Sequence, residues 1–276
     1  MKQQLLFVAV FFSFAANAQK IALNKGRQIT ITSVITQDID MMGMGMKMKN
    51  DTKSTGVVEV KSFDNENYTS TYTLSKMNLN MDMMGQQNSY DSEKPADRES
   101  EMGKAFADKL GKEVTVLINK NTGKTTLDKK AIVEKPAAEA NPMDGLMDSF
   151  GAVGEEATVE TVFFIIPTGK KTGDTWIDSS TNKGMKEIKT YTFKSVAGNI
   201  ATIGLFSTLE GRNAMESQGM QMDVNISAKT EGEILVDTAS SLVKKRSSVM
   251  DLTGAIDVMG QSVPISSKAI ASIDYN

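Results

Sequence analysis

The sequence contains no cysteine and no histidine, and these two absences exclude several classes of protein. Without cysteine the chain can form no disulfide and has no thiol to carry a lipid anchor. A Ser-His-Asp triad, a Cys-His pair and an imidazole-based metal site all need histidine, so none of them is possible. Carboxylate-only or Ser-Lys chemistry remains open in principle, but the sequence shows no short motif for either. We therefore expect a protein that is not an enzyme and that uses no cofactor and no metal.

The sequence also has no large excess of positive or negative charge. Lys and Arg number 31 against 34 Asp and Glu, the two signs are interspersed, and the formal net charge is −3. Nucleic-acid-binding proteins concentrate positive charge, so we expect no nucleic-acid partner. An anionic membrane surface would likewise exert no electrostatic attraction on this chain.

The beginning of the chain has the pattern of a secretory signal peptide. Lys2 precedes an apolar run from Leu5 to Ala15, and Ala16-Asn17-Ala18 stands before Gln19. The apolar run is too short to remain as a permanent membrane anchor. We expect cleavage of residues 1–18 between Ala18 and Gln19, which removes Lys2 and changes the net charge from −3 to −4. The mature protein would then be periplasmic or secreted.

The rest of the chain is dominated by the alternation typical of β-strands. From Ile29 to Met41 the odd positions are mainly apolar and the even ones mainly Thr and Asp, which predicts a long strand with one buried face. Turn signals at 65–67, 119–123 and 197–199 separate strand-like segments, as antiparallel hairpins require. A stretch from Pro95 to Leu110 favours helix, and further helical segments are expected at 143–150 and 155–166. The pattern predicts an α+β fold, mainly antiparallel β, with a few short helices from the central segment.

We expect residues 19–276 to form a single β-rich domain, within which two halves can be distinguished. These halves cover about 19–94 and 167–276, and a helical and hairpin segment, 95–166, joins them. Gly45-Met46-Lys47-Met48 resembles Gly219-Met220-Gln221-Met222, and Met84-Gly85-Gln86 matches Met259-Gly260-Gln261. Two interpretations stay open: a diverged internal duplication, or the general similarity of one β-meander to another.

Methionine is the most over-used residue type, with 19 in the chain. The candidate ligand-lining methionines are Met41, Met44, Met46, Met48, Met81, Met83 and Met84. Thioethers at alternating positions could bind Cu(I), because soft sulfur suits a soft cation. They could equally cover a sheet face as flexible apolar side chains that adapt to varied ligands. Because no His or Cys is present to complete a mixed site, we favour the apolar lining.

Two other features are candidates for a role. Trp176 is the only tryptophan, and it follows a turn-like Lys171–Thr175 segment. It could be a large core aromatic at the start of the second half, or it could stack on a ligand. The basic run Lys244-Lys245-Arg246 suggests a solvated edge strand that discourages sheet-to-sheet association.

Several short motifs carry a resemblance to a known family. They are the start of the mature chain, Asn88 to Ser92, Gly173 to Trp176, Gly232 to Asp237, and Val258 to Gln261. With these motifs the chain resembles a family of exported Bacteroidota proteins of unknown function. More distantly, it is similar to the half-barrel of the periplasmic lipoprotein carrier. That resemblance implies a curved antiparallel sheet that cups apolar ligands and is closed by short helices. It implies no catalytic residues.

The leading functional hypothesis is therefore a non-catalytic envelope protein that binds or carries a lipid, a lipoprotein or another hydrophobic ligand. A curved sheet with a methionine-lined concave face could accept acyl chains without exact polar contacts. The first alternative is a structural or interaction scaffold whose sheet is filled by its own side chains. Copper handling is the next alternative.

Overall fold

The computed structural model describes residues 21–42, 45–107, 109–127, 155–182, 184–217, 220–258 and 261–276. Its strands are β1 (Gln28–Met41), β2 (Met46–Phe63), β3 (Asn67–Met83), β4 (Gln86–Asp91), β5 (Glu113–Asn119), β6 (Thr125–Leu127), β7 (Thr175–Asn182), β8 (Met185–Ala197), β9 (Ile200–Ser217), β10 (Met220–Asp237), β11 (Leu242–Val258) and β12 (Gln261–Tyr275). Its helices are α1 (Pro95–Arg98), α2 (Glu101–Phe106) and α4 (Glu155–Glu160). Within these residues, no helix is long enough and apolar enough to cross a membrane.

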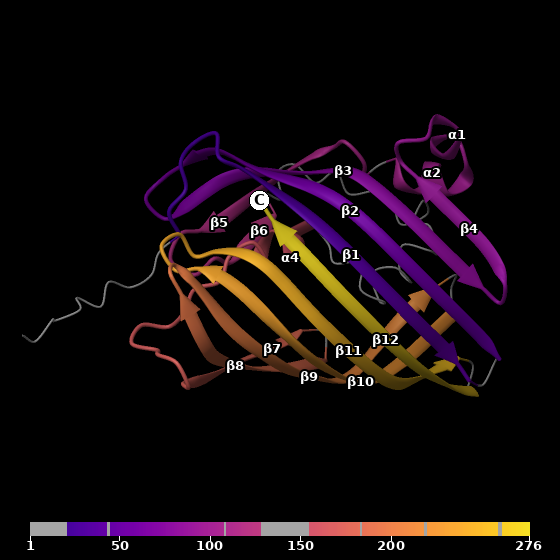
Figure 1. Ribbon diagram of the computed structural model, residues 1–276. Helices are drawn as coiled ribbons and strands as arrows, with labels where there is room; N and C mark the ends of the chain where they lie inside the picture. The colour runs from indigo at the N-terminus through magenta and orange to yellow at the C-terminus, as the bar shows by residue number, and fades with distance from the viewer. Residues whose placement is uncertain are drawn as a thin grey trace, which may run out of the picture.

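All of these strands belong to a single open sheet of 12 strands (Figure 1). The strand order is β6-β5-β3-β2-β1-β12-β11-β10-β9-β8-β7, and β4 pairs with the C-terminal part of β3. Every pairing between named strands is antiparallel. The expected fold class, mainly antiparallel β with few short helices, is confirmed. The hairpin turns expected at 65–67, 119–123 and 197–199 are confirmed as well.

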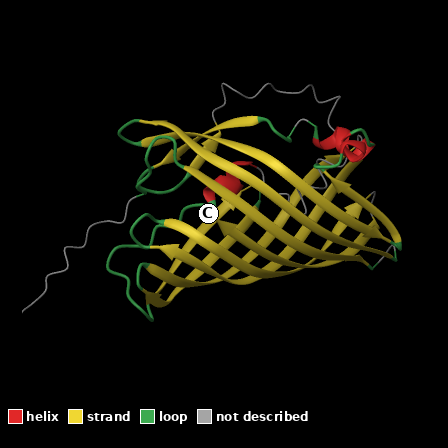
Figure 2. Cartoon of the chain, turned by 45° about the horizontal axis from the view of Figure 1, so that its top comes forward, coloured by secondary structure: helices red, strands yellow, loops and turns green. Residues whose placement is uncertain are grey.

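The sheet curves into a trough with α4 on its concave side (Figure 2). Side chains at alternate positions therefore point to the concave or to the convex face. In β1, Ile29, Ile31 and Ile39 are buried on the concave face, while Val34 and Asp38 are exposed on the convex face. This is the period-two pattern that the sequence shows in this segment.

One end of the trough, which we call the packed end, holds the main hydrophobic core. Val159 and Val162, from α4 and the turn after it, are completely buried against Ile203 and Val236 of the sheet. Backbone hydrogen bonds anchor this turn, from Phe164 N–H to Ser241 O (3.0 Å) and from Val243 N–H to Val162 O (2.9 Å). The segment expected to be helical to residue 166 is therefore helical only to Glu160, because the turn after the helix pairs with the start of β11.

A smaller core lies under α1 and α2. Tyr90 and Phe106 are both buried, with ring centroids 5.4 Å apart, and they pack with Met77 and Leu79 of β3. Ser100 caps α2 by accepting a hydrogen bond from Gly103 N–H at 3.0 Å. The single helix expected from residue 95 is thus divided in two at this cap. The helix expected at 143–150 lies outside the described residues.

The prediction that Lys244-Lys245-Arg246 marks an edge strand is wrong. These residues lie in β11, which is paired on both sides, with β10 and with β12. Lys245 forms a cross-strand ion pair with Asp274 (Nζ to Oδ1, 3.4 Å). Arg246 faces the concave side and donates from Nε to Thr161 O at 3.3 Å. Two residues of the basic run therefore link β11 to β12 and to the turn after α4, and the run does not protect a sheet edge.

Candidate ligand-binding faces

Most of the candidate methionines come together on the concave face. In the sheet register Met41 lies opposite Met46, Met48 opposite Met83, and Asn50 opposite Met81. Because Met48 also lies opposite the buried Ile39, all of these methionines share its face. We call Met41, Met46, Met48, Met81 and Met83 the methionine face. It lies at the end of the trough away from the packed end, where the β1–β2 and β3–β4 turns are found, and we call this end the hairpin end.

The methionine face continues into an apolar cluster on neighbouring strands. Ala228, Leu252 and Ile265 are buried together, and Met41 packs against them. The cluster extends through the partly buried Leu209, Ile226, Met250 and Ile256. Apolar side chains therefore cover the concave face at the hairpin end from β3 across to β9.

Two candidate residues lie elsewhere, and a third cannot be placed. Met84 is in the β3–β4 turn and is mostly exposed, and Met44 lies outside the described residues. Trp176 packs against the main core, stacked on Tyr191 with ring centroids 5.5 Å apart and 6.2 Å from the Phe164 ring. This placement favours the interpretation of Trp176 as a core aromatic and separates it from the methionine face.

Polar groups interrupt the concave face midway along β1 and β2. Gln37 Nε2 donates to Ser267 Oγ at 3.2 Å in a buried position. Beside Gln37 in the register, Asn50 Oδ1 is buried without a hydrogen-bond partner. An unpaired buried acceptor is costly, and because this oxygen is buried, a donor group of a ligand would reach it only if neighbouring side chains moved. Sequence reasoning missed Asn50, although its alternation with Met46 and Met48 placed it on the same face.

The β7–β8 side of the concave face carries charge. Lys189 Nζ lies 2.9 Å from Glu187 Oε2, and Ser207 Oγ donates to Glu187 Oε1 at 3.0 Å. Burial acts to lower the pKa of Lys189, but its hydrogen bond to Glu187 and its attraction to that carboxylate together outweigh burial, so the pKa is raised. Burial also raises the pKa of the Tyr191 hydroxyl. Lys189 therefore stays protonated and Tyr191 stays neutral near pH 7, and neither is suited to act as a general base.

The convex face carries a row of alternating charges that sequence reasoning also missed. The row crosses six adjacent strands from β10 to β3, in the order Lys229, Asp251, Lys268, Asp38, Lys49 and Asp82. Lys268 Nζ lies 3.9 Å from Asp251 Oδ1, and Asp82 Oδ1 accepts from Gly85 N–H at 2.9 Å. We call these six residues the charge row. Each strand contributes one residue, so only the register reveals the alternation.

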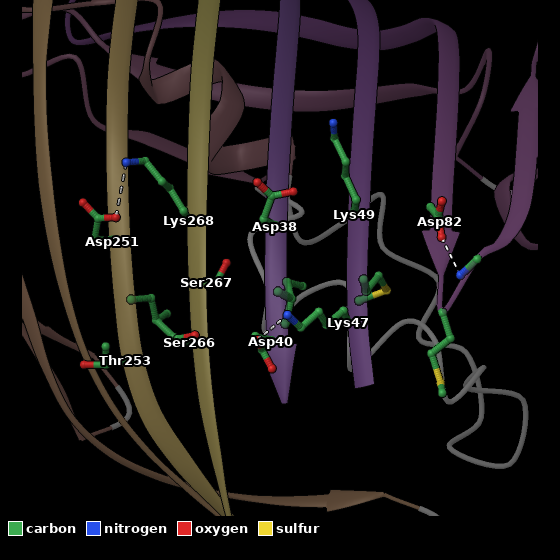
Figure 3. A pocket seen from close by; sticks show the side chains of 15 residues that line it. Asp38, Asp40, Lys47, Lys49, Asp82, Asp251, Thr253, Ser266, Ser267 and Lys268 are labelled. Atoms are coloured by element: carbon green, nitrogen blue, oxygen red, sulfur yellow. Dashed lines mark hydrogen bonds and ion pairs between the residues drawn. The ribbon is translucent and has the colours of Figure 1, made fainter. Parts of the chain in front are cut away.

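Beside the charge row lies a shallow hollow of about 530 Å³ (Figure 3). Its second wall is a parallel row of Thr253, Ser266, Asp40 and Lys47, in which Lys47 Nζ lies 3.6 Å from Asp40 Oδ2. Carboxylates here alternate with ammonium groups, which neutralise them. Among the described residues, no group of three or more His, Cys, Asp or Glu is placed to hold a metal ion. The hollow has the character of a solvated sheet surface stabilised by cross-strand charge pairs.

Residues 65–243 of the chain match a protein family. The chain belongs to DUF6263, a family of unknown function. The resemblance to a family of unknown function is thereby confirmed at this level, whereas its bacterial source and its export stay predictions. No curated protein matches this DUF6263 chain.

Two solved structures align with nearly the whole chain. A lipovitellin structure matches with a TM-score of 0.51 and 10% identity, over 92% of this chain and 25% of that chain. The DUF6263 chain thus spans about a quarter of the lipovitellin chain, and it shares the fold of that aligned part. An outer membrane channel from Pseudomonas putida F1 aligns over 93% of this chain and 97% of that chain, at 6% identity. Its TM-score of 0.22 is too low to support any argument.

Proposed function

We propose that this DUF6263 protein is a non-catalytic exported protein of the cell envelope that binds or carries a lipid or another hydrophobic ligand. The methionine face is the observation that carries this proposal, because it gathers unbranched thioether side chains on three adjacent strands. Methionine has three rotatable bonds and adapts its shape to different apolar partners. A fixed core would be specified better by Leu or Ile. The ligand is therefore an acyl chain or a molecule of similar flexibility.

Two further observations support a lipid. The lipovitellin structure with the shared fold is described by its lipid–protein interactions. The unpaired Asn50 Oδ1 lies beside the methionine face and is buried, so it offers an acceptor to the hydroxyl or amide of a lipid head group when the flexible methionine side chains around it move aside. An apolar surface with one polar contact is the usual composition of a lipid-binding site.

Binding can be tested with fatty acids of increasing length that displace a fluorescent probe. Each added methylene should tighten binding about fourfold, which corresponds to about 0.8 kcal/mol, until the apolar surface is full. Met48→Gln with Met83→Gln should weaken binding at least tenfold, because the amides make the face polar while keeping the side-chain length. The matched control, Met48→Leu with Met83→Leu, should retain binding. Equal affinities for all chain lengths would contradict the proposal.

Export is proposed from the first residues of the chain. N-terminal sequencing of protein recovered from the periplasm or medium of the producing cell should begin at Gln19. Recovery of the protein embedded in a membrane with residues 1–18 retained would contradict this part of the proposal.

A structural scaffold is the second candidate, and a specific observation favours it. Ile39 and Ile265 on the concave face are already 3% and 2% exposed. Two hollows, one beside the charge row and one around Phe206, both lie on the convex face. If no fatty acid binds at any length, the concave face is filled by the chain's own side chains and the scaffold function is the better conclusion.

A further inference from the structure

We propose that the hairpin end docks on an uncharged lipid bilayer surface by inserting Met42 and Met84. This inference rests on the proposed function, since it names the surface from which the ligand is taken or to which it is delivered. Met42 is 60% exposed in the β1–β2 turn, and Met84 is 66% exposed in the β3–β4 turn. The two turns are side by side, because Met84 N–H donates to Lys47 O at 3.1 Å.

The backbone at Met84 shows that its side chain is exposed at a conformational cost. Met84 and Gly85 have φ angles of 55° and 84° and form the two-residue link between β3 and β4. A link with positive φ at both residues favours Asn-Gly, because Asn tolerates the left-handed conformation better than a long side chain does. The Asp82 carboxylate holds the turn by accepting from Gly85 N–H at 2.9 Å. A long apolar side chain is thus presented to the surroundings where a small polar one would make a better turn.

A bilayer fits these turns better than a protein partner does. The exposed side chains here are flexible thioethers at adjacent turns, and such side chains adapt to the irregular apolar interior of a bilayer. Met41 and Met83 lie next to the turns and begin the methionine face, so apolar side chains continue from the turns onto the concave face. A lipid chain leaving the bilayer would find an apolar surface along this path.

Apolar insertion, and not charge, would drive the docking. The net charge is −3, or −4 for the chain from Gln19 onward, and the charge row near the turns alternates in sign. The protein should therefore bind phosphatidylcholine vesicles, which carry no net charge, and its affinity for them should hardly depend on salt concentration.

The absence of cysteine from the chain allows a sharp test. In the chain from Gln19 onward, Met84→Cys and Ile177→Cys each create one attachment point for an environment-sensitive fluorophore. Ile177 is 69% exposed on the edge strand β7 and serves as the matched control. With phosphatidylcholine vesicles, the fluorophore at position 84 should shift to the blue and the one at position 177 should not. In the unlabelled protein, Met42→Ser with Met84→Ser should lower vesicle flotation at least fivefold and leave fatty-acid binding unchanged.

Each outcome decides between the two proposals. An aqueous spectrum at position 84, an equal shift at both positions, or binding only to anionic vesicles would overturn the docking inference. If fatty acids still bind in any of those cases, the proposed function stands without it. If the position-specific shift occurs but no fatty acid binds, docking is supported and the proposed function fails. Capture of a protein instead of vesicles through the same methionines would also overturn the bilayer inference.

Discussion

Tyr275 donates a hydrogen bond from its hydroxyl to Thr161 Oγ1, 2.8 Å away, and so joins the last strand to the turn after α4. Thr161 in turn donates to Thr158 O at 2.6 Å, and Arg246 Nε donates to Thr161 O at 3.3 Å. These bonds hold α4 against the concave face at the packed end. Two predictions concern this end of the trough.

The first is a loss of stability at high pH. Burial raises the pKa of the Tyr275 hydroxyl above its ordinary value of about 10. A raised pKa in the folded state means that its stabilisation is complete below pH 10 and is lost as the pH rises through the folded-state pKa. We expect the free energy of unfolding to fall above about pH 10, and to fall less steeply in Tyr275→Phe. At pH 7 this variant should lose about 1 kcal/mol, the cost of one hydrogen bond. Denaturant titrations at several pH values measure both effects, and an equally steep fall in Tyr275→Phe would refute the assignment.

The second prediction concerns the packing against α4. Ile203 is completely buried, whereas Val196 on the neighbouring strand is 53% exposed. Ile203→Ala should lower the free energy of unfolding by about 2–5 kcal/mol, because it removes buried methyl groups and leaves a cavity. Val196→Ala, the control, should change it by less than about 0.5 kcal/mol. Similar small effects for both would mean that the packed end is not the core.

The third prediction concerns the charge row. Asp38 lies between Lys268 and Lys49 in the register, so Asp38→Lys places it beside two like charges. Each unfavourable pair should cost about 0.2–1 kcal/mol, and 1 M salt should abolish most of the loss. Lys268→Glu changes the net charge in the opposite direction and should also destabilise. If only one of these two variants lowers the free energy of unfolding, the change in net charge is responsible and the local pairing is not.

The fourth prediction concerns copper. The methionine face provides several thioethers, and among the described residues no group of three or more His, Cys, Asp or Glu is placed to hold a metal ion. We expect it to serve as an apolar lining and to bind Cu(I) with a dissociation constant weaker than about 1 µM, or about 8 kcal/mol. Titration against a Cu(I) chelator measures this. A submicromolar affinity that disappears when Met41, Met46 and Met48 are changed to Leu would instead establish a copper site.

Local patterns predicted the parts of the fold that depend on neighbouring residues. The period of two in Gln28–Met41 and the turn residues at 65–67 correctly predicted strands and hairpins. The sequence predicts helices in the central segment, but it does not predict the residues at which they end. Phe163 pairs with Leu242 of β11, and this long-range contact ends the helix that local propensity would extend.

The sequence by itself determined that the sheet is antiparallel, that alternate residues face opposite sides, and that methionine is available to cover one of them. Only the tertiary structure decided which strands are neighbours and how they are aligned. Lys244-Lys245-Arg246 looked like an edge because strand order is set by contacts between distant segments, which a local run of charge does not reveal. The charge row, the pairing of Met48 with Met83 and the unpaired Asn50 all depend on register. Register is a property of several strands packed together, because burying one face against α4 and its turn selects a single alignment for the sheet.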